Sequence, residues 1–466
     1  MNDGTTLEAP RDLTPALSEL HRRIDGAVTI PQDASWDADR AAWALAVDQR
    51  PALVVRAAHA EDVVTAVRFA VAHRLRVAAQ GTGHNAAPLG DLGDTMLLRT
   101  DLMRGVTIDA ERMIARVDAG VLWQQVTAAA AEHDLAALAG SSDDVGVVGY
   151  TLGGGVSWLA RSHGLGANSV TAIELVTAGG ELRRVDEQTD PDLFWALRGG
   201  GGAFGVVTAL EFRLYPMASV YSGALFWPIE RAADVMHAWR EWTVDLPASV
   251  MTAARVMKFP PIPDMPEPMR GRAFVIVEAV LQDAPAAADA LLAELRRLQP
   301  EIDTFAPTPM PALSALHMDP PGPVPGVGDG ALVRELSHEA MEAFLSVAAT
   351  PRGASLLSAE FRLLGAALAP GQEDGGAVSG LSGAYLLFAG GMAPTRESAT
   401  VVRSELDDLL DAVAPWRSES DYLNFTESPA AAERIYGDAL PRLREIKRRV
   451  DPSDVIRSNH PLWSGR

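Results

Sequence analysis

The chain has 466 residues, 48% of them hydrophobic and 22% charged, which is typical of a folded protein with more than one domain. Forty Lys and Arg residues against 61 Asp and Glu residues give a net charge of -21, which would repel a phosphate backbone and an anionic membrane surface. We therefore expect a small molecule as the partner, and neither nucleic acid nor a membrane.

The sequence has no cysteine, which excludes disulfides, thiolate metal sites, thiol nucleophiles and thioether links to a cofactor. The first residues lack the apolar core of a signal peptide, and no later run approaches the ~18 apolar residues of a membrane span. The expected location is therefore cytoplasmic. No two of the ten histidines lie within four residues of each other, so no helical zinc pair exists and no metal is predicted.

The first predicted elements alternate between strands and a helix. Residues 51–58 and 75–80 have the pattern of strands, and residues 60–74 between them have that of a helix with acidic residues in its first turn. This βαβ order leads directly into the loop "GTGHN", which starts at Gly81 and contains His84.

The chain is rich in glycine from there to Pro216. Its predicted elements are a strand at 115–120, a helix of about a dozen residues after Gly120, a hairpin at 171–186, a helix at 190–198 and a strand at 205–215. From Ser219 to Trp416 the pattern changes to strands such as 272–281 and 384–391, a helix at 286–298 and proline-rich loops. We interpret this second part as a separate α+β domain whose long loops shape a pocket.

Glycine clusters follow several of the predicted strands. Glycine allows a positive φ and a close approach of the backbone to a ligand, and successive free N–H groups suit a pyrophosphate. Each cluster alone could be a simple turn, but three within about 75 residues indicate a dinucleotide. The loop "GTGHNAA" lacks the third glycine of the Rossmann fingerprint, and "YTLGGGVSW" lacks the lysine of a P-loop, so the nucleotide needs a different fold.

His84 has three candidate roles from the residues alone: metal ligand, general base or covalent anchor. A histidine on a surface loop is the remaining alternative. A serine hydrolase is not indicated, because no Gly-x-Ser-x-Gly sequence occurs.

Four stretches carry a resemblance to a known family. They are "RVAAQGTGHNAAP", "VGVVGYTLGGGVSWLARSHGLGANSV", "DPDLFWALRGGGGAFGVVT" and the tail that runs from "YLNF" to "RLREIKRRVDPSDVIRSNHPL". In their order and spacing they resemble the FAD-linked oxidases of the vanillyl-alcohol oxidase superfamily, in particular the berberine-bridge-enzyme-like group. The resemblance covers residues 45–215 and 420–462.

The resemblance implies an α+β fold with a PCMH-type FAD-binding domain of two α/β subdomains. That domain is expected to combine residues 1–217 with a returning C-terminal segment, residues 418–466. Residues 218–417 between them are expected to form a substrate domain whose antiparallel sheet, covered by helices, lies over the flavin. The expected oligomeric state is a monomer or a homodimer.

The resemblance also implies that His84 bonds covalently to the 8α-methyl group of FAD. Many relatives add a cysteine link to flavin C6, but Ser142 holds the place of that cysteine, so the link through His84 is expected to be single. Val145 corresponds to a family position that controls the approach of oxygen, and a small valine there favours an oxidase. The full set of residues expected to bind FAD is Gln80, Gly81, Thr82, Gly83, His84, Asn85, Ser142, Val145, Gly146, Gly149, Tyr150, Gly153, Gly154, Gly155, Asn168, Val207 and Asn459.

The catalytic base is the least defined part of the prediction. The family's tyrosine is replaced by Phe425, which cannot exchange a proton. Two replacements are considered: Tyr422, and Glu360 with Arg362, which alternation places on one face of a strand. Glu360 is the preferred base, and a purely structural ion pair with Arg362 is the alternative.

The predicted function is that of an FAD-dependent oxidase. It would take a hydride from a small organic substrate, such as an alcohol, an amine or a polyphenolic or polyketide-type metabolite, and pass the electrons to O2, giving H2O2. Secondary metabolism is a fitting context, and a sugar substrate stays open. The alternatives are a dehydrogenase or an oxygenating enzyme of the same fold, or a catalytically inactive protein that binds flavin or another ligand.

Overall fold

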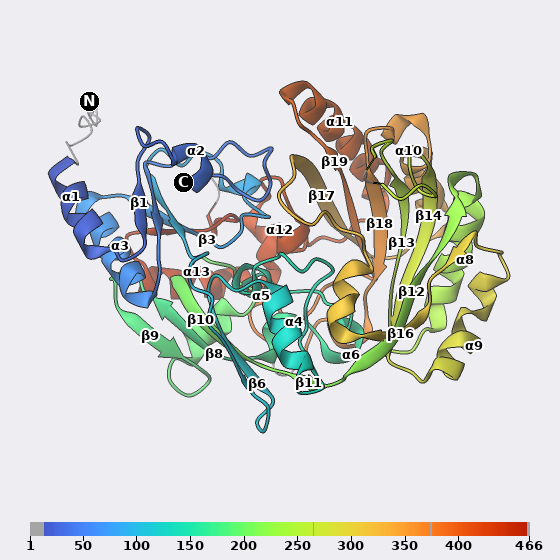
Figure 1. The fold of residues 1–466 in the computed structure, drawn as a ribbon, viewed down its shortest axis with the longest axis horizontal. Coiled ribbons are helices and arrows are strands. Elements are labelled where there is room, and N and C mark those ends of the chain that lie inside the picture. Colours follow the sequence, from blue (N-terminus) through green and yellow to red (C-terminus); the bar gives the residue numbers. More distant parts are fainter. Residues whose placement is uncertain (1–13, 264, 373–374, 464–466) are drawn as a thin grey trace.

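The computed structural model describes residues 14–463 apart from residue 264 and residues 373–374 (Figure 1). Two halves lie side by side. One contains the N-terminal strands and the C-terminal helices, and the other contains the strands and helices between Ser219 and Ala412 (Figure 1). The predicted α+β class is confirmed. Within the described residues, no helix has the length and apolar character needed to cross a membrane.

The first sheet has the strand order β1 (Ala27–Thr29), β2 (Leu53–Arg56), β4 (Thr95–Arg99), β3 (Arg76–Gln80) and β20 (Ile456–Arg457). All neighbours are parallel except β1 and β2. Helix α3 (Ala60–His73) connects β2 to β3, so the predicted βαβ unit is confirmed. The His59 side chain caps the helix by accepting the N–H of Asp62, and Arg74 ends it with a φ of +58°.

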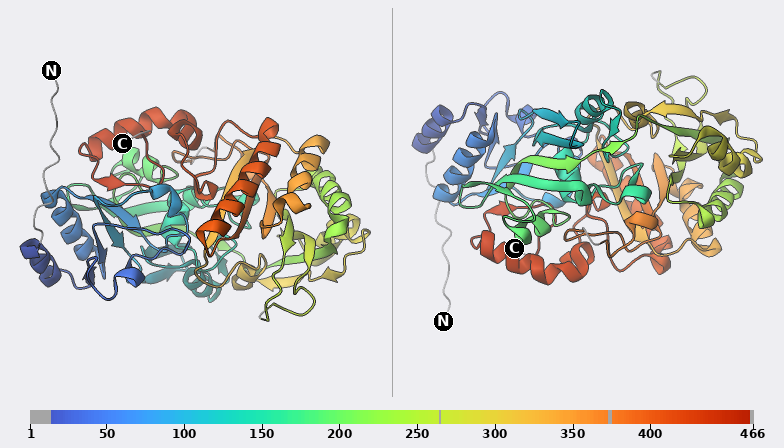
Figure 2. Two further views of the ribbon diagram at one scale, coloured as in Figure 1. Left: turned by 90° about the horizontal axis from the view of Figure 1, so that it is seen from above. Right: turned by 90° about the horizontal axis from the view of Figure 1, so that it is seen from below.

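The second sheet is antiparallel, with the order β5 (Val106–Asp109), β6 (Ile114–Asp118), β10 (Val206–Arg213), β8 (Val170–Val176) and β9 (Leu182–Val185). The predicted hairpin is the β8–β9 pair. One apolar core joins this sheet to the helices α4 (Trp123–Ala131), α5 (Val147–Leu152), α7 (Pro191–Leu197), α12 (Ala432–Tyr436) and α13 (Leu440–Val450). The C-terminal helices therefore belong to the core of the N-terminal half, as both views in Figure 2 show.

The third sheet is antiparallel and forms most of the other half. Its order is β15 (Ile302–Asp303), β12 (Ser219–Pro228), β14 (Ala273–Leu281), β13 (Val250–Lys258), β18 (Ser358–Leu363), β19 (Tyr385–Met392) and β17 (Gly326–Val333), and β16 (Ala306–Pro309) also pairs with β12. One face packs against α8 (Ala232–Trp242), α9 (Pro285–Arg296), α10 (His338–Ala348) and α11 (Arg396–Ala412).

The opposite face of the third sheet is turned toward the N-terminal half. Its residues Ala253, Val280 and Leu386 share an apolar cluster with Trp158 and Tyr422. The remaining elements are α1 (Thr14–Arg23), α2 (Trp36–Asp39), α6 (Ala160–His163), β7 (Leu135–Ala136) and β11 (Tyr215–Pro216).

Candidate cofactor cleft and the charged cluster beside it

A cleft with an empty volume of about 1310 Å³ opens between the first two sheets and the C-terminal segment. It is lined by residues 79–86, by residues 145–153, by residues around Gly202, by residues 423–425 and by residues 457–459. The fold thus brings glycine-bearing loops that lie far apart in the sequence to one place.

Most of the residues that the sequence predicted to bind the cofactor line this cleft. They are Gln80, Gly81, Thr82, Gly83, His84, Asn85, Val145, Gly146, Gly149, Tyr150, Gly153, Val207 and Asn459. Their roles toward a cofactor stay predictions, but the structure does bring them together.

Four predicted residues lie outside the lining: Ser142, Gly154, Gly155 and Asn168. Gly155 is a packing position, because a Cβ on it would lie 2.4 Å from Cε1 of Tyr150. The Asn168 amide donates to the carbonyl of Ser379, away from the cleft. Gly154 has a φ of +116°, and its carbonyl accepts the N–H of Ala167. The triplet "GGG" thus forms a backbone turn after its first member, and the roles of these four residues toward a cofactor stay predictions.

Several features of the lining fit a long polar ligand. Among the residues that the structure describes, both amide atoms of Gln80 and the side-chain oxygen of Asn85 are buried without a hydrogen-bond partner. A Cβ on Gly149 or Gly202 would meet no described atom within 4 Å, so the missing side chains leave open space in the cleft. Gly83 has a φ of +88°, a conformation that favours glycine. This combination suits a dinucleotide bound by backbone and amide groups.

His84 lies in a group of four side chains, which we call the His84 group: Trp43, Thr82, His84 and Asp144. The imidazole stacks on the Trp43 indole with ring centroids 4.1 Å apart, and Thr82 Oγ1 lies 2.7 Å from Nδ1. Nε2 lies 3.4 Å from Asp144 Oδ1. Although burial opposes it, the nearby His84 imidazole and the hydrogen bonds from Trp43 and Ser142 hold the pKa of Asp144 below its usual range.

Buried charges lie on the face of the third sheet that is turned toward the cleft. Together with His317, from the segment between β16 and β17, they form what we call the charged cluster: Arg255, Glu278, His317, Glu360 and Arg362. Arg362 Nε donates to Glu360 Oε1 at 2.7 Å, so the predicted shared face of these two residues is present. The other Glu360 oxygen lies 3.0 Å from His317 Nε2. His317 Nδ1 lies 2.6 Å from Glu278 Oε2, and Arg255 donates to the second Glu278 oxygen.

The charges in this cluster fix its protonation. Although burial raises the pKa of a carboxyl, Arg362 and His317 hold the pKa of Glu360 far below its usual range. Burial and Arg255 lower the pKa of His317, but the carboxylates of Glu278 and Glu360 outweigh both and raise it to about 9. These positive charges favour the ionised form of Glu360. Its assignment with Arg362 as a catalytic pair stays a prediction, and the structural ion pair stays the alternative.

Tyr422, the other candidate base, is buried and hydrogen-bonded. Its hydroxyl accepts hydrogen bonds from the backbone N–H of Gly155 and from the Asn424 amide, both at 3.0 Å. Burial raises the pKa of Tyr422 to about 12. Phe425, in contrast, lines the cleft, and its ring lies 4.9 Å from the Phe388 ring and 5.1 Å from the Arg362 guanidinium carbon.

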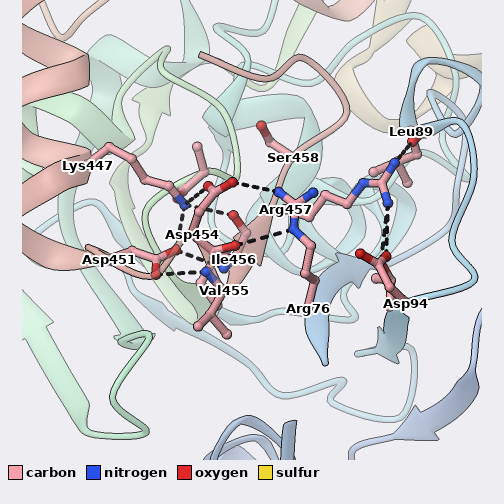
Figure 3. A network of polar contacts seen from close by, with 12 residues as sticks. Arg76, Leu89, Asp94, Lys447, Asp451, Asp454, Val455, Ile456, Arg457 and Ser458 are labelled. Atoms are coloured by element: carbon pink, nitrogen blue, oxygen red, sulfur yellow. Dashed lines mark hydrogen bonds and ion pairs between the residues drawn. The ribbon is translucent and has the colours of Figure 1, made fainter. Parts of the chain in front are cut away.

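The C-terminal segment reaches the cleft because a polar network holds it in place (Figure 3). Lys447 Nζ donates to the carbonyls of Ala203 and Ile456 and pairs with Asp451. Arg76 pairs with Asp454 at 2.9 Å, which secures β20 beside β3 (Figure 3). The next residues, Ser458 and Asn459, are thereby placed in the lining of the cleft.

Sequence reasoning did not single out Trp43, Asp144 or His317. Trp43 and His317 lie far from the motifs they contact, and no periodicity links them. Asp144 had a visible signal, since an acidic residue in "GSSDDVG" is unexpected beside a predicted anion site. Away from the cleft, His237 on α8 also meets His338 and Glu342 on α10, a group that sequence spacing alone could not reveal.

The comparisons with known proteins agree with this geometry. A family model described as "FAD binding domain" matches residues 51–186, and one described as "Berberine and berberine like" matches residues 421–462. BBE-like 1 of Physcomitrella patens superposes with a TM-score of 0.84 at 19% identity, covering 96% of this chain and 99% of that one. The structure of 6-hydroxy-D-nicotine oxidase from Arthrobacter nicotinovorans gives a TM-score of 0.80 at 25% identity, covering 94% and 98%.

Two curated relatives match about half of this chain. The (R)-6-hydroxynicotine oxidase of Paenarthrobacter nicotinovorans is 35% identical over 205 residues, 44% of this chain and 45% of the relative. The xylooligosaccharide oxidase of Thermothelomyces thermophilus is 29% identical over 246 residues, 51% and 49%. The chain thus spans about half the length of these two relatives.

The fold and the cleft define a PCMH-type FAD-binding protein. Both family segments are present in the order that the sequence predicted, and the structural neighbours extend over almost the whole chain. The chain therefore carries the FAD-binding domain and the berberine-like segment, as the resemblance to the vanillyl-alcohol oxidase superfamily predicted, and its fold is that of the BBE-like structures.

Proposed function

We propose that this protein is an oxidase that carries one FAD on His84 through a single covalent bond. It takes a hydride from a small organic substrate and passes the electrons to O2, giving H2O2. The observation that supports this proposal is the meeting of His84, the glycine loops and the unpaired amide atoms of Gln80 and Asn85 in one cleft. The chain has no cysteine, so a second thioether link is not available.

When bound, FAD supplies the hydride acceptor and the electron donor to O2. The chain's own residues bind and orient it. Backbone N–H groups of the glycine loops suit the diphosphate of FAD, and the side-chain amides of Gln80 and Asn85 suit other polar groups of the cofactor. Val145 lies in the lining, and its small side chain favours access of oxygen. The Phe425 ring presents an apolar surface to the cleft that excludes water.

The lining favours an amine within the proposed substrate class. Arg457 is the one Asp, Glu, Lys or Arg side chain of the described lining, and the Tyr150 hydroxyl donates to the carbonyl of Leu138. An alcohol must lose its O–H proton as the hydride leaves, so it needs a base. A neutral amine does not, because loss of the hydride from the adjacent carbon leaves an iminium ion.

The proposal is tested by turnover and by reoxidation. The purified holoprotein is incubated aerobically with matched amines and alcohols, and H2O2 is measured against substrate consumed. We expect one H2O2 per turnover and faster turnover of the amines. The protein reduced without oxygen is then mixed with air in a stopped-flow instrument. Fast return of the oxidised flavin spectrum supports the oxidase, and slow return indicates a dehydrogenase. A long-lived spectrum of an oxygenated flavin indicates an oxygenating enzyme. If no substrate reduces the flavin, the protein is an inactive binding protein.

A further inference from the structure

The His84 group contains a carboxylate that the proposed function leaves without a role. Asp144 lies in the stretch "GSSDDVG", two residues after Ser142, and faces the imidazole of His84 from the side opposite Thr82. We propose that Asp144 is the positioning residue that prepares His84 for covalent attachment to the flavin. This inference rests on the proposed function, because it requires that His84 carries the flavin.

Asp144 is itself held firmly. One of its carboxylate oxygens accepts the indole N–H of Trp43, and the other accepts the Ser142 hydroxyl at 2.9 Å. Trp43 is fixed in turn, since its backbone N–H donates to the carbonyl of Thr82 at 2.9 Å. The carboxylate therefore approaches His84 Nε2 from a direction that the surrounding side chains set.

This arrangement selects one tautomer of His84. An ionised carboxylate only accepts hydrogen bonds, so its presence beside Nε2 favours the tautomer with the proton on Nε2. Nδ1 then carries the lone pair, and the Thr82 hydroxyl donates to it at 2.7 Å. Stacking on Trp43 fixes the plane of the ring. Nδ1 is thus the nitrogen prepared to act as the nucleophile.

The attachment step follows from this tautomer. The Nδ1 lone pair forms a bond to C8α of oxidised FAD, and one C8α–H bond breaks with loss of its proton to solvent. The two electrons remain on the flavin ring until dioxygen accepts them, with two protons, as H2O2. As the bond forms, the imidazole becomes positively charged with its proton on Nε2, and the adjacent Asp144 carboxylate stabilises that charge.

The test measures attachment of FAD, which is separate from catalysis. Full-length protein produced under riboflavin limitation is incubated with FAD, and the covalently labelled fraction is followed by intact mass over time. We expect Asp144→Asn to slow labelling at least about tenfold at saturating FAD, because the amide no longer favours the Nε2–H tautomer. Reversible FAD binding, measured by fluorescence quenching before labelling, should stay close to that of the wild type.

Matched variants separate this role from a general structural one. Asp143→Asn makes the same charge change one residue away and should label at the wild-type rate. Trp43→Phe keeps a ring stacked on His84 but removes the indole N–H that donates to Asp144, so it should slow labelling less than Asp144→Asn does. If Asp144→Asn does not fold, the labelling rate of Trp43→Phe decides whether Asp144 has this role. Asp144→Glu should restore part of the rate.

The outcomes distinguish the two proposals. A wild-type protein that never gains the mass of FAD would overturn the covalent link and leave the reversible FAD fold in place. A labelled wild type together with wild-type labelling rates in both Asp144→Asn and Trp43→Phe would overturn the role of Asp144 alone.

Discussion

The two polar groups beside the cleft differ in how their polar atoms are paired. Beside the His84 group, Gln80 and Asn85 keep buried polar atoms without a hydrogen-bond partner within the described chain. In the charged cluster, opposite charges meet at 2.6 to 3.0 Å and are enclosed by the sheet. The unpaired atoms of Gln80 and Asn85 belong to residues that line the cleft, where a ligand can reach them. In the charged cluster Arg255 Nε and Glu360 Oε2 also make no hydrogen bond within the described chain, but each of these side chains is paired with an opposite charge. A high density of charge near a cleft therefore does not by itself locate the chemistry.

The largest expected effect comes from removing one charge from the charged cluster. Arg255→Met should lower the free energy of unfolding by about 3–5 kcal/mol, because it leaves the buried Glu278 without its guanidinium partner. Denaturant unfolding measures this change. As a control, Arg272→Met breaks an exposed ion pair with Glu301 and should cost about 0–1 kcal/mol. Equal costs in the two variants would show that the cluster is not buried as described.

The charged cluster should also make the free energy of unfolding depend on pH, through His317. The folded pKa of His317 is about 9, above its ordinary value of 6.5, so its contribution to stability is complete below pH 6.5 and is lost as the pH rises through 9. The loss should be on the order of 2–3 kcal/mol. It is measured as the fall in unfolding free energy between pH 7.5 and 9.5, and His317→Gln should remove that slope.

Glu427 changes its protonation at a lower pH than His317, so it does not obscure the His317 contribution to stability. Burial and the neighbouring Asp329 raise the pKa of Glu427 from 4.5 to about 7. Its contribution to stability is therefore present below pH 4.5 and is lost by about pH 7, before most of the His317 loss occurs.

The cofactor cleft is tested by placing a larger side chain in it. Gly149→Leu places a side chain where a Cβ meets no described protein atom, so it should occupy the cleft and weaken FAD binding between about tenfold and a hundredfold. The melting temperature of the FAD-free protein should not fall, because Gly149 lies in helix α5, where leucine is favourable. Gly322→Leu also enters open space, but away from the cleft, and should leave FAD binding unchanged.

The smallest expected effect concerns Tyr422. Tyr422→Phe removes the acceptor for the Gly155 N–H and the Asn424 amide, so it should cost about 1–2 kcal/mol of stability. The rate of flavin reduction by substrate and its pH profile should stay the same, as measured by anaerobic stopped-flow mixing. A large loss of that rate in a correctly folded variant would support Tyr422 as the base.

The sequence predicted the parts of this molecule that depend on local pattern. The βαβ unit, the hairpin at β8–β9 and the shared face of Glu360 and Arg362 all follow from periodicity within a few residues. The meeting of the glycine loops followed from the family resemblance. The partners Trp43 and His317 could not be predicted, because each reaches its site from a segment without any pattern that points there.

Other features of the site depend on tertiary contacts that no local pattern shows. Gly154 and Gly155 match a cofactor motif, but the tyrosine rings packed on them occupy the space beside their backbone. Alternation predicts the shared face of Glu360 and Arg362, but the second positive charge beside Glu360, that of His317, comes from a different segment.

The central claim, that His84 carries FAD in this cleft, is tested most directly by peptide mapping. The purified full-length protein is precipitated with acid, digested with a protease, and its peptides are measured by mass spectrometry, with His84→Ala and the exposed His133→Ala treated in parallel. The account predicts a yellow pellet, one FAD on the peptide that contains His84, loss of that label in His84→Ala and its retention in His133→Ala. A colourless pellet with all FAD in the supernatant, or a label on another residue, would contradict it.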